Sequence, residues 1–244
     1  MTKLSVNVNK LATLRNARGK NNPDVLNMVL KIIAYGADGI TVHPRPDGRH
    51  IRYEDVYAIK QAIDVEFNIE GYPEQSFLDL VLEVKPEQCT LVPDAPNVLT
   101  SNAGWLIEKN LSFLKRTIHT LHREGIRTSL FIDPYTLSEQ DRRLLTETGT
   151  DRVELYTEAY ADAYGTSREL EVTAVYQEVA FALQQQGIAL NAGHDLNLDN
   201  LRAFLTAIPF IEEVSIGHAL VCDALMLGMQ TTIERYLACT LSCC

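Results

Sequence analysis

Short apolar runs rich in β-branched residues alternate along the chain with longer segments in which apolar residues recur every three or four positions. The short runs predict eight strands, spaced about 30 residues apart, which is the length of one strand–helix unit. The predicted strands are Leu4–Val8, Gly39–Val42, Phe67–Glu70, Cys89–Val92, Thr128–Ile132, Val153–Tyr156, Ala189–Asn191 and Val214–Ile216.

The longer segments predict helices that each present one apolar stripe to a sheet. In the segments Glu108–Arg123 and Glu171–Gln186 the apolar positions step by three and four residues. Four helices are expected to end at a glycine, because glycine readily takes the left-handed conformation that closes a helix. These glycines are Gly36, Gly125, Gly149 and Gly187, and a predicted strand follows each within a few residues.

Strict alternation of strands and helices predicts a parallel sheet. Eight such units in 244 residues predict an α/β fold of the (β/α)8 TIM-barrel type, whose typical size is close to this length. Composition is ordinary for a globular domain, with 46% apolar and 22% charged residues. We therefore expect one barrel domain over residues 1–244, with a flexible cysteine-rich tail at 239–244. An open doubly wound sheet is the alternative, but its G-x-G-x-x-G turn is missing.

One predicted loop is longer than a simple connection. Residues 93–104 (PDAPNVLTSNAG) follow the fourth predicted strand and are rich in Pro, Asn, Ser and Thr. Long ordered loops in compact domains often cover a ligand, and we expect this loop to act as a lid.

The charge and cysteine content exclude several classes of protein. A formal net charge of −10 argues against general nucleic-acid binding, which needs a basic surface. No window approaches 18 uninterrupted apolar residues, and the N-terminus lacks the features of a signal peptide, so we expect no membrane span. Five cysteines, three of them in the last six residues, do not form a disulfide framework, which favours a cytoplasmic protein.

Polar and titratable residues gather where the predicted strands end. In barrels of this type the chemistry lies at the carboxyl ends of the strands. Histidine serves as acid or base near neutral pH, and burial above an apolar barrel would raise the pKa of Glu70 and Glu154. For Glu154 the alternative is a structural salt bridge to Arg152. The candidates at these ends are Asn7, Asn9, Lys10, His43, Arg45, Glu70, Glu154, His194, Asp195, Gly217 and His218.

Two Gly-His steps indicate a phosphate site. Gly193-His194 and Gly217-His218 are each expected just before a helix, where a close backbone approach and free N–H groups favour an oxyanion. Loops after strands 7 and 8 form the usual phosphate site of this fold. With Arg18 and Arg45 from the first two loops, the site could hold two anionic groups.

Metal and Schiff-base chemistry are weakly supported by the residues. Metal-dependent hydrolases of this fold usually place two histidines after the first strand, where this chain has Asn7-Val8-Asn9, so no metal site is expected. A Schiff-base aldolase needs a lysine at a strand end, and Lys10 is the candidate there.

Four motifs resemble the pyridoxine 5′-phosphate synthase family, in order along the whole chain. They are ATLRNARG at 12–19, GADGITVH at 36–43, NAGH at 191–194 and IGHA at 216–219. The resemblance implies a cytoplasmic, octameric (β/α)8 enzyme of the transferase class that uses neither metal nor organic cofactor. It implies condensation of 3-amino-2-oxopropyl phosphate with 1-deoxy-D-xylulose 5-phosphate to give pyridoxine 5′-phosphate, phosphate and water, a step in vitamin B6 biosynthesis.

The resemblance also implies roles for individual residues. His43 and Glu70 would be general bases, His194 a general acid, and Glu154 would stabilise charge that develops during ring closure. The residues implied for the amino-ketone phosphate are Asn7, Arg18, Gly217 and His218, and those for the xylulose phosphate are Arg45, His50 and Thr100.

The chain departs from the family pattern at several substrate-contact positions. Asn9-Lys10 stands where most members carry Asp-His, a pair that meets the sugar phosphate, and Asp195 stands where many have glycine. Tyr156 and Glu158 replace a common histidine and glycine. These changes put substrate contacts in question more than the acid–base residues. Two alternatives therefore stay open: an aldolase or isomerase acting on another sugar phosphate, and a non-catalytic protein that binds phosphate ligands.

Overall fold

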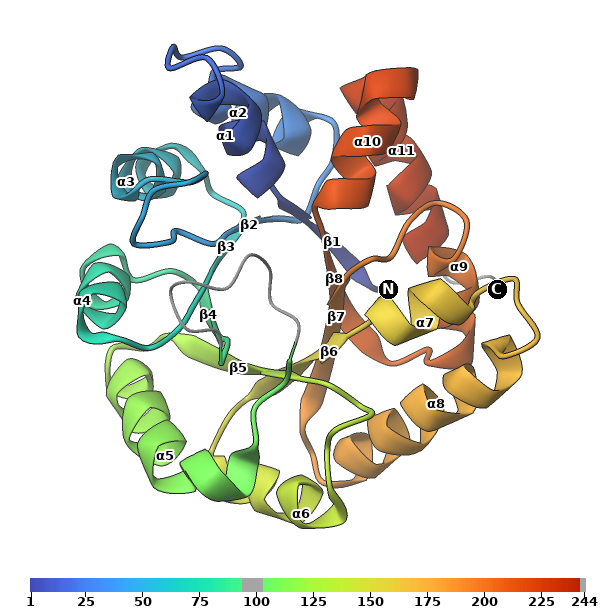
Figure 1. Ribbon diagram of the computed structural model, residues 1–244. Coiled ribbons are helices and arrows are strands. Elements are labelled where there is room, and N and C mark those ends of the chain that lie inside the picture. The colour runs from blue at the N-terminus through green and yellow to red at the C-terminus, as the bar shows by residue number, and fades with distance from the viewer. Residues whose placement is uncertain (94–102, 242–244) are drawn as a thin grey trace.

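Eight parallel strands close into a barrel in the order β1 to β8, with β8 pairing back onto β1 (Figure 1). The computed structural model describes residues 1–93 and 103–241. The strands are β1 Lys3–Asn7, β2 Gly39–Val42, β3 Glu66–Gly71, β4 Gln88–Leu91, β5 Arg127–Ile132, β6 Arg152–Tyr156, β7 Ala189–His194 and β8 Ile211–Ile216. The predicted (β/α)8 barrel is confirmed.

Helices surround the barrel as an outer ring (Figure 1). Their bounds in the described residues are α1 Asn9–Asn16, α2 Val25–Ala34, α3 Tyr53–Ala62, α4 Gln75–Val84, α5 Ile107–Arg123, α6 Glu139–Thr148, α7 Glu158–Ala163, α8 Glu169–Gln185, α9 Leu201–Ala207, α10 His218–Leu227 and α11 Met229–Thr240. The four glycines predicted to close helices, Gly36, Gly125, Gly149 and Gly187, all have positive φ angles between 75° and 108°. They therefore do what the sequence pattern predicts.

Strand β7 is longer than predicted. It continues through Gly193 and His194, so the first Gly-His step belongs to a strand, and the next helix, α9, begins only at Leu201. The expectation that both Gly-His steps lie just before a helix is therefore wrong for this one. The second step is placed as predicted, because Gly217 is the N-cap residue of α10.

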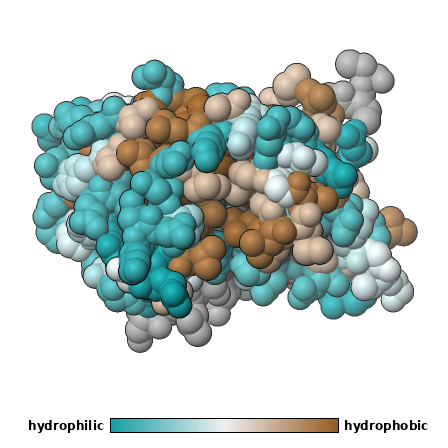
Figure 2. Space-filling view, turned by 90° about the horizontal axis from the view of Figure 1, so that it is seen from above, coloured by the Kyte–Doolittle hydropathy of each residue, from teal (hydrophilic) through white to brown (hydrophobic). Residues whose placement is uncertain are grey.

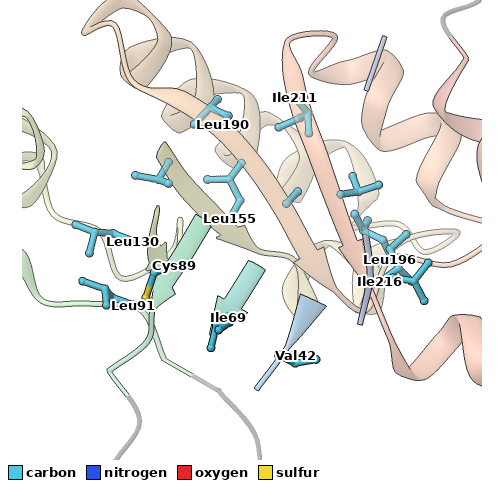
Figure 3. Close-up of a cluster of buried hydrophobic side chains, with 14 of the residues drawn as sticks. Val42, Ile69, Cys89, Leu91, Leu130, Leu155, Leu190, Leu196, Ile211 and Ile216 are labelled. Atoms are coloured by element: carbon cyan, nitrogen blue, oxygen red, sulfur yellow. The ribbon is translucent and has the colours of Figure 1, made fainter. Parts of the chain in front are cut away.

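The apolar core lies between the strands and the helices. Outward-facing strand residues such as Ile40, Ile69, Leu130 and Leu155 are fully buried in it. Figure 3 shows part of this layer around the strands. Successive residues of a strand point to opposite faces of the sheet, so every second side chain points away from the barrel axis. The outer ring of helices packs on these side chains.

The barrel interior is polar, not apolar as the sequence suggested. Ser5 and Thr41 hydroxyls lie 2.7 Å apart, and Thr90 donates to Asn68 Oδ1 at 3.0 Å. All four side chains are buried. Burying polar groups is affordable here because they hydrogen-bond one another across neighbouring strands.

Charged residues close the amino-terminal end of the barrel. We call Lys3, Glu66, Arg127, Arg152 and Glu213 the basal ion cluster. Glu66 pairs with Arg127 and, at 3.2 Å, with Lys3, while its Oε1 lies 3.8 Å from Arg152. Buried Glu213 shares a hydrogen bond with Glu66 and accepts from Asn191 Nδ2 at 3.4 Å. Arg152 donates to Glu212 at 2.5 Å and to Asn191 at 3.2 Å, so it is not the salt-bridge partner proposed for Glu154.

Helix α11 includes the first two residues of the predicted tail. It runs through Cys239 to Thr240, and Thr240 is buried. Ile233 and Tyr236 are fully buried and anchor this helix, and the flexibility expected for 239–244 stays a prediction. Residues 242–244 lie outside the described residues.

Part of the outer surface is apolar. On the side where α1, α2, α10 and α11 lie in Figure 1, apolar residues appear among hydrophilic ones (Figure 2). Leu14 of α1, Leu30 of α2, and Leu225 and Met226 of α10 are exposed large apolar side chains. No helix in the described part of the chain has the length and apolar character needed to cross a bilayer.

Candidate active site

A cavity of about 340 Å³ opens at the carboxyl ends of the strands. This is the end of the barrel where the loops can vary without disturbing the core. It is lined by Asn7, Asn9, Lys10, His43, Arg45, His50, Glu70, Glu154, Tyr156, Glu158, His194, Asp195, Ser215, Gly217 and His218. Twelve of these fifteen residues were predicted as site residues from the sequence.

Asn7, His43 and Glu70 lie together where β1, β2 and β3 end. His43 Nδ1 lies 3.7 Å from Glu70 Oε2, and Asn7 Nδ2 donates to the same oxygen at 3.4 Å. His43 and Glu70 are 7% and 5% exposed. The pKa of His43 is well below its ordinary value, first because of burial and then because of the positive charge of Arg45. His43 is therefore neutral at pH 7 and free to accept a proton.

Asn9 and Lys10 open helix α1 at the edge of the cavity. Asn9 Oδ1 accepts from the backbone N–H of His43 at 2.9 Å, and its own N–H donates to Asn7 Oδ1 at 3.1 Å. Asn9 thus holds the end of β2 against the end of β1. The charge of Lys10 contributes to lowering the pKa of both His50 and His194, and all three residues line the same cavity.

His50 and Arg45 follow β2 on the basic side of the cavity. The His50 ring lies 6.3 Å from the His43 ring, and its Nδ1 accepts from the backbone N–H of Ile51 at 2.9 Å. Burial, followed by Arg45 and Lys10, lowers the pKa of His50 to about 4. This side of the cavity therefore carries fixed positive charges on Arg45 and Lys10 and a neutral hydrogen-bonding ring.

His194 stands on the opposite side, at the end of β7. Its backbone has φ +83°, a conformation that few non-glycine residues adopt. Two rings pack on its imidazole, Phe131 at 5.0 Å and Tyr156 at 5.1 Å. Burial, then Lys10, lowers the pKa of His194 to about 4. Residues in sparsely populated backbone regions often mark functional sites.

Glu154 and Ser215 lie at the floor of the cavity and are 2% and 5% exposed. Burial, then the charge of Glu70, raises the pKa of Glu154 well above its ordinary value. Gly193 lies between the two, because a Cβ there would come 2.5 Å from Glu154 Oε1 and 2.8 Å from the Ser215 carbonyl. Only glycine leaves room for both groups at this position.

The N-terminus of α10 forms one wall of the cavity. Gly217 is its N-cap, and a Cβ on Gly217 would meet Asn7 at 3.1 Å. The first N–H groups of a helix have no partner within the helix and attract anions. With His218 as the first helical residue, this wall can bind a phosphate group.

An acidic rim faces the basic side. Tyr156 donates to Glu158 Oε2 at 2.7 Å. Partial burial and then the neighbouring charges of Glu158 and Asp162 raise the pKa of Asp195. The cavity thus has positive residues from β1 and β2 on one side and carboxylates from β6 and β7 on the other.

The sequence model of the family described as "Pyridoxal phosphate biosynthesis protein PdxJ" matches residues 4–242. The chain belongs to this family. Two similar relatives carry the name pyridoxine 5′-phosphate synthase. The protein of Parabacteroides distasonis is 54% identical over 239 residues, covering 98% of this chain and 99% of the relative. That of Porphyromonas gingivalis is 55% identical over 237 residues, covering 97% of this chain and 98% of the relative.

Solved structures support the barrel alone. The chain is similar to 3-keto-L-gulonate-6-phosphate decarboxylase of Vibrio cholerae, with a TM-score of 0.67 at 9% identity, over 98% of this chain and 97% of the other. It is also similar to the tryptophan synthase A-subunit of Pyrococcus furiosus, with a TM-score of 0.65 at 12% identity, over 97% of each chain.

The family resemblance seen in the motifs is confirmed, and with it an enzyme of vitamin B6 biosynthesis.

Arg18, which the PdxJ resemblance implicated, is exposed beyond the end of α1 and does not line this cavity. The buried arginine of that motif is Arg15, which instead pairs with Asp55 at 2.5 Å. Thr100 and most of the predicted lid lie outside the described residues.

Three lining residues were not predicted as site residues: Tyr156 and Glu158, noted only as departures from the family pattern, and Ser215. Ser215 lies on β8, two residues after Glu213. Alternate residues of a strand point to the same face, so both side chains point into the barrel. The period of the strand could have identified Ser215, but a lone serine carries no chemical signal. Among the described residues, no group of three or more His, Cys, Asp or Glu is placed to hold a metal ion.

Proposed function

We propose that the chain condenses 3-amino-2-oxopropyl phosphate with 1-deoxy-D-xylulose 5-phosphate to form pyridoxine 5′-phosphate, phosphate and water. The observation that carries the proposal is one cavity with acid–base groups on two sides and two separate anion-binding walls. His43 and Glu70 come from β2 and β3, whereas His194 comes from β7 across the barrel. Groups on both sides allow repeated proton transfer without moving the intermediate.

Two phosphates require two binding regions. The N-terminus of α10, with Gly217, His218 and Asn7, is our candidate for the amino-ketone phosphate. Arg45, His50 and Lys10 on the other wall are the candidate for the xylulose phosphate, where Lys10 adds a cation that balances the loss of the usual Asp-His pair. Fixing both substrates lowers the barrier, since good orientation can contribute roughly 7–11 kcal/mol. Thr100 keeps its predicted role here by resemblance alone, and Arg18 is assigned no contact.

The bases are set up by their surroundings. His43 is neutral because its pKa is low, and Glu70, 3.7 Å away, can accept the proton that His43 takes up. Burial and the charge of Glu70 raise the pKa of Glu154 well above its ordinary value, which favours the protonated form, and this form can donate a hydrogen bond to an oxygen that gains negative charge during ring closure. Asn9 acts through His43, by holding the backbone at the end of β2.

His194 must bind a proton before it can act as a general acid. With a pKa of about 4, His194 is neutral in the empty site. The amine of the amino-ketone must lose a proton before it attacks the ketone, and we propose that His194 takes this proton. It then returns the proton to the hydroxyl group that leaves as water, so that no proton is gained or lost overall in this exchange.

The test is a two-substrate assay on chelator-treated protein. We expect pyridoxine phosphate absorbance and released phosphate to appear together. Binding of either substrate without product would contradict the proposal and favour a non-catalytic phosphate-binding protein. Borohydride trapping of the ketose phosphate on Lys10 would instead favour the aldolase alternative.

We also propose a homo-oligomer in the cytoplasm, an octamer by family resemblance. The exposed apolar side chains of Leu14, Leu30, Leu225 and Met226 support association. The free thiols of Cys89, Cys222 and Cys239 agree with a reducing compartment. Sedimentation velocity should give a multiple of the 27.3 kDa chain mass, and a monomer at micromolar concentration would contradict it.

A further inference from the structure

Two polar atoms at the floor of the cavity have no hydrogen-bond partner among the described residues. They are Glu154 Oε2 and Ser215 Oγ, and both are buried. A buried polar atom without a partner destabilises the fold, and native proteins contain few of them. Both atoms belong to residues that line the cavity, so a bound molecule can supply the missing hydrogen bonds.

Both residues lie beside Gly193 of the strand between them. Glu154 is on β6 and Ser215 on β8, with β7 between them, and Gly193 is paired in register with Ser215. Glu154 Oε1 and the Ser215 backbone carbonyl both crowd the space where a Gly193 side chain would be. Groups on the strands of a barrel keep their geometry better than groups on loops, which suits a binding site.

The chemistry of the pair favours a neutral, hydroxyl-bearing ligand. A serine hydroxyl can donate and accept, and so can a protonated carboxyl group. The charge of Glu70 acts on Glu154. A negative charge so placed repels an anion, which disfavours a phosphate at this position. The groups suited to anions lie elsewhere: Lys10 is on α1, and Arg45 and His50 are in the segment after β2.

We propose that Ser215 Oγ and Glu154 Oε2 together bind one hydroxyl group on the carbon chain of the ketose phosphate. This inference rests on the proposed function, and it makes Ser215 a residue that determines specificity for a hydroxylated substrate. The ketose phosphate carries hydroxyl groups between its carbonyl and its phosphate, whereas the amino-ketone phosphate carries none. The pair would therefore orient the sugar carbons beneath the basic wall.

The chain offers a matched control. Ser129 on β5 is also a buried serine whose Oγ has no partner among the described residues, but it does not line the cavity. In the full-length protein we expect Ser215→Ala to lower kcat/KM for the ketose phosphate about 10-fold, the usual size for one lost hydrogen bond. Ser129→Ala should leave kcat/KM unchanged. Neither variant should lower Tm, because neither hydroxyl has a partner in the protein. Equal losses in both variants, or no loss in Ser215→Ala, would overturn the inference.

Binding measurements separate this inference from the proposed reaction. Calorimetry compares 1-deoxy-D-xylulose 5-phosphate with analogues that lack the hydroxyl group at C3 or at C4. The unmodified protein and Ser129→Ala should bind one analogue about 10-fold more weakly. In Ser215→Ala the difference in affinity between that analogue and the full substrate should shrink, because only Glu154 Oε2 is left to bind the hydroxyl group. An undiminished difference in Ser215→Ala refutes the hydroxyl site, whereas lack of product from the unmodified protein refutes the reaction and leaves the binding result readable.

Discussion

The two ends of the barrel use buried charge in opposite ways. At the amino-terminal end, the carboxylates of the basal ion cluster face the guanidinium groups of Arg127 and Arg152 at close range. At the carboxyl end, His43, His194 and Glu154 are buried while facing a cavity, and burial is the largest cause of each pKa shift. At the amino-terminal end of the barrel, opposite charges pair with one another. At the carboxyl end, buried polar groups face a cavity in which a ligand can bind to them.

The comparison shows why one fold can be both stable and reactive. Partnered ions at the base hold the strand ends in register, so removing one partner should destabilise the protein. At the top, Glu154 and Ser215 each leave a buried atom without a partner among the described residues, and the other polar groups face the cavity, so removing one should harm the reaction more than the fold.

The largest expected effect is at the top. Glu70→Gln removes the proton acceptor beside His43 and keeps the shape of the side chain. We expect kcat to fall roughly 10²–10⁴-fold, the usual contribution of a general base, with Tm unchanged or higher. Steady-state kinetics and thermal unfolding measure the two quantities. Unchanged turnover would remove Glu70 from the mechanism.

The counterpart at the base is Arg152→Met. This change leaves Glu66 and Glu213 without one of their cations, and we expect a loss of roughly 3–5 kcal/mol in the free energy of unfolding, as for other broken buried ion pairs. The kcat of the folded fraction should be unchanged. Arg142→Met is the control, since Arg142 pairs with the exposed Glu178. A loss of kcat in Arg152→Met at full folding would erase the contrast between the two ends.

A smaller effect concerns pH. Burial, then Glu66, raises the pKa of Glu213 from 4.5 to about 8. The folded chain therefore holds a proton that the unfolded chain releases, so this contribution to stability is full below about pH 4.5 and is lost as pH rises through about 8. Glu213→Gln should reduce the slope of unfolding free energy against pH in this window by up to about 1.4 kcal/mol per pH unit.

The histidines at the top have the opposite sign. The pKa of His194 falls from 6.5 to about 4, so its contribution to stability is lost as pH falls through that interval. His194→Asn should therefore make the protein less sensitive to acid between pH 6.5 and 4, while Glu178→Gln, an exposed control, should change neither slope. Glu213→Gln should change the pH dependence of the unfolding free energy on the alkaline side, and His194→Asn should change it on the acid side. If both variants change it on the same side, the proposed directions of the two effects are wrong.

The smallest effect is expected at Tyr156. Tyr156→Phe removes the hydrogen bond to Glu158 but keeps the ring that packs on His194. We expect kcat to fall less than about 5-fold, since a typical hydrogen bond contributes about 1 kcal/mol. Tyr156→Ala also removes the tyrosine ring. The imidazole of His194 then becomes more hydrated, so its pKa, measured by NMR titration, should shift towards its ordinary value. Identical titrations in both variants would show that the ring does not set the environment of His194.

Much of the fold could be predicted because local patterns repeat. Strand and helix periodicity, with glycines such as Gly125 and Gly187 at helix ends, predicted eight units and hence a closed barrel. The predicted end of β7 was wrong, since His194 continues the strand at a positive φ angle, and helix α11, anchored by the buried Tyr236, continues to Thr240 into the predicted tail. Neither effect leaves a mark in the local sequence.

The sequence by itself determined the architecture, the family and the types of reactive residue, because periodicity and long motifs depend only on the order of residues. Only the tertiary structure decided which of these residues meet. It brought His43 and Glu70 within 3.7 Å, left Arg18 outside the cavity, and made Ser215 part of its floor. It also made the barrel interior polar, because hydrogen bonds between residues far apart in the chain, such as Ser5 and Thr41, form only when the strands close.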